Sequence, residues 1–162
     1  MTNFVRELKI VLLGHVAVGK TSIALRFTED KFDPNTESTI GASFLTKSLV
    51  IGETKYNLKI WDSAGQERYR SLGTMYYKDS DATILVYDVS VRSTFKKMKE
   101  WYEELKKFGP ENIFVVVCAN KIDLENQQIP KKQRRRFRKN IMVWNLWKHQ
   151  QKKELTSKIF SN

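Results

Sequence analysis

The residues best suited to chemistry lie near the N-terminus, in a glycine-rich stretch that ends in a lysine and a threonine. The stretch comprises Gly14, His15, Val16, Ala17, Val18, Gly19, Lys20 and Thr21, which fits the pattern G-x-x-x-x-G-K-[ST]. Its glycines let the backbone wrap around phosphates, and backbone N–H groups at a helix N-terminus supply positive potential. Lys20 would reach the β- and γ-phosphates of a nucleoside triphosphate, and the Thr21 hydroxyl would bind Mg²⁺. A plain glycine turn between a strand and a helix is the alternative.

Two short polar motifs could complete such a site. In the segment Asp62–Gln66, the acid can hold the water shell of Mg²⁺, and Gly65 lets a backbone N–H approach the γ-phosphate. The segment Asn120–Asp123 ends in a carboxylate that can accept hydrogen bonds from N1–H and the 2-amino group of guanine. Adenine supplies no such pair of donors, so this segment would select guanine. Each short motif alone also occurs by chance in solvated loops.

Each of the three motifs directly follows a segment that the sequence predicts to be a strand. Apolar runs and alternating patterns typical of strands cover Arg6–Leu13, Ser43–Ile51, Tyr56–Trp61, Ala82–Tyr87 and Ile113–Ala119. Helical spacing of apolar residues predicts helices over Thr21–Thr28 and Ser93–Phe108. Strands that alternate with helices predict an α/β fold, with a mostly parallel, doubly wound sheet covered by helices on both faces.

Length and composition limit the class of protein. A chain of 162 residues with 41% hydrophobic residues fits one globular domain and excludes collagen-like or wholly disordered chains. We find no apolar run long enough to span a membrane and no signal peptide. Cys118 is the single cysteine, which excludes an internal disulfide and fits a reducing compartment such as the cytoplasm.

In this order, the motifs resemble those of the Ras-like small GTPases and, more finely, the endosomal branch of the Rab family. The resemblance also rests on Ser38–Phe44, Trp61–Leu72 and Met75–Tyr77, and it covers about residues 6–130. It implies the Ras-like P-loop GTPase fold and a monomeric switch that hydrolyses GTP to GDP and phosphate with Mg²⁺ as cofactor. Its partners would be effectors, exchange factors and GTPase-activating proteins of endosomal vesicle traffic.

The resemblance also implies roles for single residues. Gln66 would be catalytic, because it would orient the attacking water. Thr39 would bind Mg²⁺ through its hydroxyl and the γ-phosphate through its N–H, and Phe32 would pack against guanine. The guanine-binding set would then be Phe32, Asn120, Lys121 and Asp123. The effector-binding set would be Ile40, Phe44, Trp61 and Tyr76, for which ordinary core packing of the aromatic residues is the alternative.

Two positions depart from the family pattern. Val16 occupies the position nearest the γ-phosphate, where small or hydroxyl-bearing residues are usual in the family. Its branched side chain should crowd Gln66, the attacking water and any incoming arginine, so we expect slow hydrolysis and weak stimulation by activating proteins. Ser63 replaces the usual threonine, a mild change that keeps the hydroxyl and removes one methyl group.

The tail, residues 131–162, does not resemble the family. It carries eleven basic residues and one acidic residue, whereas residues 1–130 are almost neutral. We find neither a Ser-Ala-Lys motif nor a clear sixth strand or closing helix, so we expect the last strand and helix to be missing. The predicted organisation is a GTPase domain over residues 1–130 followed by a basic, non-family tail.

A shifted reading frame would account for the tail. If each codon takes the last base of one present codon and the first two of the next, Trp144–Asn145 and Trp147–Lys148 must both give glutamate. One allowed reading of residues 144–152 is Glu-Phe-Met-Glu-Thr-Ser-Ala-Lys, which supplies the missing motif. We therefore interpret the tail as the product of a frame slip near Lys131 and Lys132.

The tail could instead be a native segment with a role of its own. It could be an alternative C-terminus made by splicing, or a nuclear-localisation, nucleic-acid or anionic-lipid segment. Trp144 and Trp147 could stack on bases. Because Ile159–Asn162 contains no cysteine for prenylation, we expect only indirect membrane contact, although the family is found at endosomal membranes. The alternative function is a truncated, inactive GTPase whose basic tail binds nucleic acid or anionic lipid.

Overall fold

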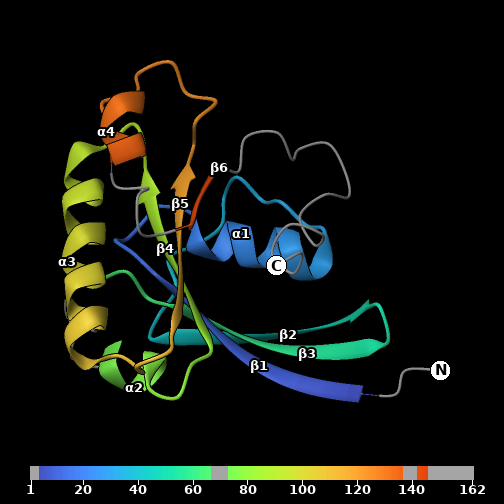
Figure 1. Ribbon diagram of the computed structural model, residues 1–162. Coiled ribbons are helices and arrows are strands. Elements are labelled where there is room, and N and C mark those ends of the chain that lie inside the picture. The colour runs from blue at the N-terminus through green and yellow to red at the C-terminus, as the bar shows by residue number, and fades with distance from the viewer. Residues whose placement is uncertain (1–3, 67–72, 137–141, 146–162) are drawn as a thin grey trace.

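A single mixed sheet forms the centre of the fold (Figure 1). The computed structural model describes residues 4–66, 73–136 and 142–145. Its strands are β1 (Phe4–Leu13), β2 (Ala42–Ile51), β3 (Thr54–Ser63), β4 (Ala82–Asp88), β5 (Phe114–Asn120) and β6 (Met142–Asn145). They lie in the order β2-β3-β1-β4-β5-β6. The β2–β3 pair is antiparallel and every other pair is parallel.

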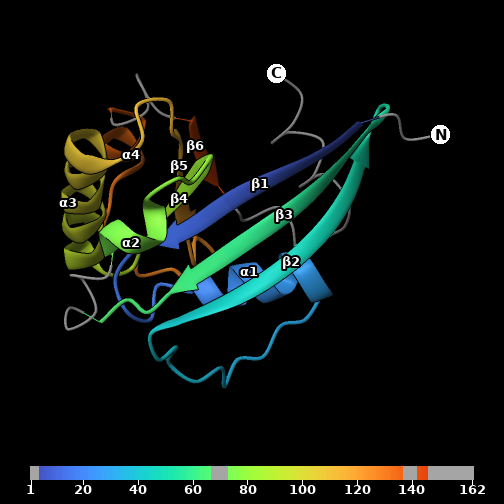
Figure 2. The same cartoon turned by 90° about the horizontal axis from the view of Figure 1, so that it is seen from below.

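Helices cover both faces of the sheet. They are α1 (Lys20–Glu29), α2 (Gly73–Tyr77), α3 (Arg92–Phe108) and α4 (Lys131–Arg136). Helix α1 lies on one face, and α2, α3 and α4 lie on the other (Figures 1 and 2). The predicted Ras-like α/β fold, with its mostly parallel, doubly wound sheet, is thereby confirmed.

Two apolar clusters hold these layers together. The larger one lies between the sheet and α3, and it includes the fully buried Leu85, Tyr87 and Met98. The smaller one lies on the α1 side, where Leu12, Ala24 and Val86 are its buried members. Helix α3 presents its apolar residues at helical spacing, and it ends at Gly109, whose N–H donates a hydrogen bond to the Leu105 carbonyl at 2.8 Å.

The strand register brings the ends of four strands to one edge of the sheet. Leu12 pairs with Asp62 across β1 and β3, and Asp88 pairs with Asn120 across β4 and β5. Parallel strands must have their carboxyl ends at the same edge, so the loops that follow these strands meet there. The three sequence motifs all lie at these strand ends and in the loops that follow them.

The C-terminal part of the sheet differs from the sequence prediction. The sequence predicts that the last strand is missing, but the four-residue β6 pairs in parallel with β5, from Val116↔Met142 to Ala119↔Asn145. Methionine, valine and tryptophan tolerate or favour extended backbone, and ladder pairing needs no family motif. The predicted absence of the closing helix concerns residues 146–162, which lie outside the described residues.

Among the described residues, none of the helices combines the length and the apolar character needed to cross a membrane. The longest, α3, has 17 residues and carries charges along its whole length.

Burial predicts that alanine substitution at two leucines lowers the free energy of unfolding by very different amounts. Replacing Leu85, which is 0% exposed, by alanine should lower the free energy of unfolding by about 2–5 kcal/mol through lost burial and the cavity left behind. Leu124→Ala, at a position 39% exposed, should cost less than about 1 kcal/mol. Chemical denaturation of both variants measures the difference, and equal losses would contradict this assignment of the core.

Candidate functional site

The glycine-rich loop, Gly14–Gly19, connects β1 to α1 and is held tightly by its surroundings. Gly14 has φ +152°, and a Cβ atom there would lie 2.2 Å from the Val86 carbonyl oxygen. A Cβ at Gly65 would lie 2.3 Å from the backbone of His15 and of Val16. The segment after β3 therefore lies directly against the loop, and both glycines are required for this approach.

The first two residues of the loop turn their backbone carbonyls toward the Lys20 side chain. Val18 is fully buried in the α1-side core, whereas His15, Val16 and Gly19 are half-buried and Ala17 is exposed. The Lys20 ammonium lies inside the loop, where Nζ donates to the carbonyls of Gly14 and His15 at 3.1 and 3.0 Å. Burial lowers the pKa of Lys20 to about 8, although Asp62 acts in the opposite direction.

Three hydroxyl groups gather around the buried Asp62 carboxylate. Thr21 Oγ1 donates to Asp62 Oδ2 at 2.6 Å, Thr39 Oγ1 at 3.2 Å and Ser43 Oγ at 3.4 Å. The Thr21 and Thr39 hydroxyl oxygens are themselves 2.8 Å apart. Burial raises the pKa of Asp62, and these hydrogen bonds and Lys20 oppose the rise. Asp62 Oδ1 is buried without a hydrogen-bond partner.

This cluster has the composition of a magnesium site that a phosphate would complete. Mg²⁺ is usually held by one or two carboxylates, waters and substrate phosphates rather than by a full cage of protein ligands. Asp62 Oδ1 offers an unsatisfied acceptor, and the two threonine hydroxyls lie beside it. Among the described residues, no group of three or more histidine, cysteine, aspartate or glutamate side chains could hold a metal alone.

The loop that follows β5 is attached to the glycine-rich loop. Asn120 Nδ2 donates to the Val18 carbonyl at 2.8 Å, and a Cβ at Gly19 would lie 2.3 Å from that same nitrogen. Lys121 Nζ donates to the Ala17 carbonyl at 2.8 Å. The structure therefore joins the two motifs that the sequence separates by about a hundred residues. Asp123 is exposed in the same loop.

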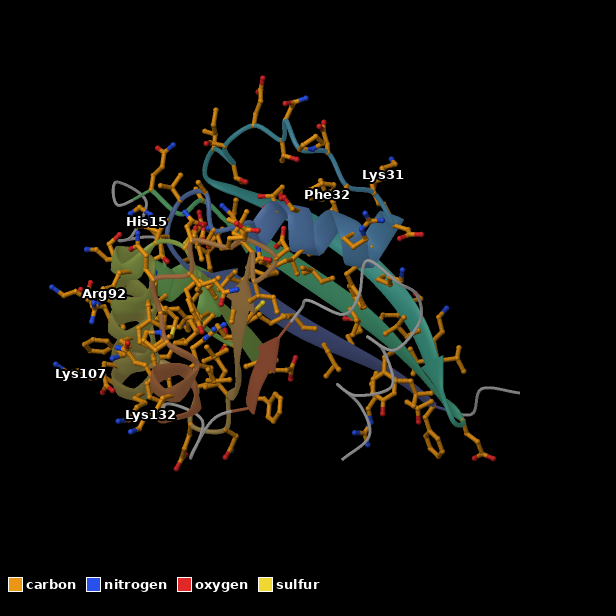
Figure 3. The ribbon with its side chains drawn as sticks, turned by 90° about the horizontal axis from the view of Figure 1, so that it is seen from above. His15, Lys31, Phe32, Arg92, Lys107 and Lys132 are labelled. Atoms are coloured by element: carbon orange, nitrogen blue, oxygen red, sulfur yellow. The ribbon has the colours of Figure 1, made fainter. Side chains whose placement is uncertain are left out.

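Two other predicted residues are placed with less support from neighbours. Phe32 is 58% exposed, and its ring centroid lies 5.8 Å from the guanidinium of Arg26 in α1. Figure 3 shows Phe32 beside α1. Gln66 is half-buried directly after Gly65, and residues 67–72, which follow it, lie outside the described residues. The Ser63 hydroxyl donates a hydrogen bond to the Leu12 carbonyl at 2.6 Å.

An aromatic cluster lies on β2, β3 and α2. Phe44 and Trp61 are direct cross-strand partners with ring centroids 5.4 Å apart, and Trp61 and Tyr76 rings are 6.3 Å apart. Phe44 is 50% exposed and Ile40 is 79% exposed, whereas Tyr76 is only 8% exposed. The exposed Phe44 and Ile40 are therefore available to a partner, whereas core packing accounts for the buried Tyr76.

Sequence reasoning missed one ion pair in this region. The Asp88 carboxylate, at the end of β4, lies 2.7 Å from Lys121 Nζ. Burial alone would raise the pKa of Asp88, but hydrogen bonds from Lys121 and Ser90 outweigh this effect and lower it. The available signal was a carboxylate at the carboxyl end of a central strand, where loops of the site begin.

This arrangement is that of a P-loop protein, and comparisons with known proteins agree. The sequence profile of the Ras family matches residues 9–161, so the chain belongs to the Ras family of small GTPases, which bind GTP and GDP. It is 46% identical to the Ras-related protein Rab-31 of Rattus norvegicus over 138 residues, which is 85% of this chain and 71% of that protein.

The alignments with two further relatives cover a smaller share of this chain. The chain is 52% identical over 119 residues to human Rab-22A, which covers 74% of this chain and 61% of that protein. It is 50% identical over 121 residues to the GTP-binding protein ypt5 of Schizosaccharomyces pombe, covering 74% of this chain and 57% of that protein. The chain thus spans less than two thirds of these two relatives. Together, the relatives place it among the Rab-type GTPases.

Proposed function

We propose that the glycine-rich loop and the loops after β3 and β5 form the nucleotide site of a Rab-type switch. The observation that supports this most directly is the Lys20 ammonium, which is 5% exposed and enclosed by backbone carbonyls. A buried ammonium whose hydrogen bonds go to neutral carbonyls would be stabilised by an anion, because bonds to phosphate oxygens would pair opposite charges. Gly14–Gly19, Lys20, Thr21, Thr39 and Gly65 would bind the phosphates.

The loop after β5 would select guanine. Asn120 and Lys121 brace the glycine-rich loop through the carbonyls of Val18 and Ala17, which fixes the position of this loop. The exposed Asp123 carboxylate would then accept hydrogen bonds from N1–H and the 2-amino group of the base. Phe32 would pack against the base, with or without its present contact with the Arg26 guanidinium.

Mg²⁺ would be held by Thr21 and Thr39 directly and by Asp62 through water. The ion would neutralise charge on the β- and γ-phosphate oxygens when bound. In the chain itself, Asp62 holds both threonine hydroxyls in place, and its unpartnered Oδ1 leaves an acceptor for water. Gln66 would orient the attacking water, because it directly follows the glycine that lies against the glycine-rich loop.

The switch would act through surfaces that depend on the γ-phosphate. Thr39 and Gly65 each belong to a segment that would contact that phosphate, so hydrolysis would release both segments. The adjacent Ile40, Phe44, Trp61 and Tyr76 would bind effectors in the GTP form. Exchange factors and GTPase-activating proteins would act on the same monomeric domain. The site of action would be the cytoplasmic side of endosomal membranes.

We also propose that the working unit is residues 1–130 and that the tail is a product of a shifted frame or an alternative C-terminus. One observation at the junction supports this division. Arg134 Nε and the Tyr87 hydroxyl are both buried without hydrogen-bond partners, although Arg134 also donates to Gln127 Oε1 at 2.9 Å. Unsatisfied buried polar atoms are costly and rare in native cores. Arg134, at the start of the tail, therefore fits poorly against Tyr87 in this part of the core.

The first test of this function is the nucleotide that heat releases from the purified chain. We expect close to one guanine nucleotide per chain, identified by ion-exchange chromatography. A variant in which the shifted frame is restored serves as the comparison. Guanine nucleotide in neither protein would contradict the proposed site, whereas nucleotide only in the restored variant would assign the loss to the tail.

Val16 predicts slow hydrolysis. Its branched side chain would stand where Gln66 and the attacking water must approach the γ-phosphate, so Val16→Ala should speed single-turnover hydrolysis of preloaded GTP by roughly three- to tenfold. Val50→Ala, at a position 61% exposed on β2, is the matched control and should leave the rate unchanged. A Val16→Ala variant that hydrolyses no faster than the parent would refute the crowding argument.

Lys20 predicts a pH dependence of nucleotide affinity. Phosphates bind the protonated ammonium, whose pKa in the ligand-free chain is about 8, so binding at higher pH requires proton uptake. The affinity for a fluorescent GDP should be constant below that pKa and should fall roughly tenfold by about one pH unit above it. Calorimetry in two buffers of different ionisation enthalpy would detect the proton.

Lys20→Met is the control for this pH effect. It should bind GDP more weakly and lose the part of the pH dependence that comes from the ammonium, while any ionisation of guanine itself persists. Equal pH profiles in the parent chain and in Lys20→Met would show that Lys20 does not titrate in this range.

A further inference from the structure

Asp88 connects three parts of the nucleotide site although it belongs to none of the predicted motifs. Its Oδ2 lies 2.7 Å from Lys121 Nζ, and its Oδ1 accepts hydrogen bonds from the Ser90 N–H at 2.8 Å and the Ser90 hydroxyl at 2.6 Å. The Asp88 side chain is 5% exposed and that of Lys121 is 36% exposed. The carboxylate is therefore fixed from the α3 side and presents its second oxygen to Lys121.

Lys121 transmits this fixed position to the glycine-rich loop. The same ammonium that meets Asp88 donates to the Ala17 carbonyl at 2.8 Å. Ala17 and Lys121 both have left-handed backbones, with φ +59° and +60°, although neither is a glycine. Such residues store strain that surrounding contacts must hold in place. The Asp88–Lys121–Ala17 connection joins the two strained residues to each other and to the start of α3.

We propose that Asp88 is a positioning residue for nucleotide retention, which acts by holding Lys121 across the glycine-rich loop. This inference rests on the proposed nucleotide site. Without the carboxylate, the ammonium loses its charged partner and the Ala17 carbonyl loses a fixed donor. The loop after β5 and the glycine-rich loop then separate more readily, which opens the path for release of the bound nucleotide.

The connection does not reach the predicted γ-phosphate contacts. Thr39 is bonded to Asp62, and Gly65 lies against the backbone of His15 and Val16, whereas Lys121 contacts the Ala17 carbonyl. Loss of Asp88 should therefore speed the release of GDP and of a non-hydrolysable GTP analogue by the same factor. A general loosening of the γ-phosphate side would instead affect the GTP analogue more.

The test is the dissociation rate of fluorescent GDP, displaced from the full chain by excess unlabelled GDP. Asp88→Asn keeps the size of the side chain and one acceptor for Ser90, but it removes the charge facing Lys121. We expect its release rate to rise roughly ten- to hundredfold, as when one partner of a hydrogen-bonded charge pair with a buried carboxylate is removed. Asp79→Asn, at an exposed position with φ +56°, is the matched control and should match the parent.

A double-mutant cycle separates positioning from general destabilisation. In the background of Lys121→Met, which itself speeds release, Asp88→Asn should add almost nothing. Independent, additive effects in this cycle would overturn the proposal. If Asp88→Asn does not fold, Ser90→Ala supplies a milder version, since it removes only the 2.6 Å hydroxyl bond and should speed release roughly threefold.

The outcomes distinguish this inference from the function on which it rests. A parent chain that retains no guanine nucleotide would overturn both. A parent chain that retains nucleotide, together with Asp88→Asn or Ser90→Ala variants that release it as slowly as the parent, would overturn the role of Asp88 alone.

Discussion

The structure depends on one buried carboxylate. Asp62 is 0% exposed at the end of β3, and removing an ionised carboxylate from water is costly unless partners replace the lost hydration. Those partners come from α1, from the loop before β2 and from β2 itself, through Thr21, Thr39 and Ser43. The buried Lys20 ammonium adds an opposite charge nearby. Satisfying Asp62 thus draws the end of β3 together with α1, the loop before β2 and β2, although its Oδ1 has no hydrogen-bond partner.

The sheet makes this convergence possible, and two residues with left-handed backbones allow the loops at its edge to meet. Because β1, β3, β4 and β5 are parallel where they pair, their carboxyl ends carry Leu13, Asp62, Asp88 and Asn120 to the same edge. The loops that leave this edge must turn sharply, and Ala17 and Lys121 do so with left-handed backbones. The apolar clusters below the edge, which include the fully buried Leu85 and Val86, supply the stability that offsets such strain.

The sequence predicts the parts of this site that depend on local spacing. Gly14–Thr21 has a fixed spacing because one turn must surround a phosphate, and the strands before each motif show as apolar runs. The Asp88–Lys121 pair could not be predicted in this way, because only the pairing of β4 with β5 brings the two residues together. Strand β6 was missed for a different reason. Its four residues carry no family motif, and the ladder with β5 is made by backbone groups.

The composition of the two apolar clusters links the stability of the sheet to nucleotide binding. The buried members given for both apolar clusters run from Val11 to Ile129, and Lys132, Gln133 and Arg134, the tail residues whose burial is described, are not among them. On the α1 face, however, Leu8, Ile10, Tyr56 and Ile84 are only partly buried. Incomplete burial there reduces the hydrophobic stabilisation of the sheet. A ligand that binds only the folded state adds stability in proportion to the logarithm of its concentration over its dissociation constant. Nucleotide bound between Lys20, Asp62 and Lys121 would therefore act as part of the core, so the folding of this chain and its retention of nucleotide should be coupled.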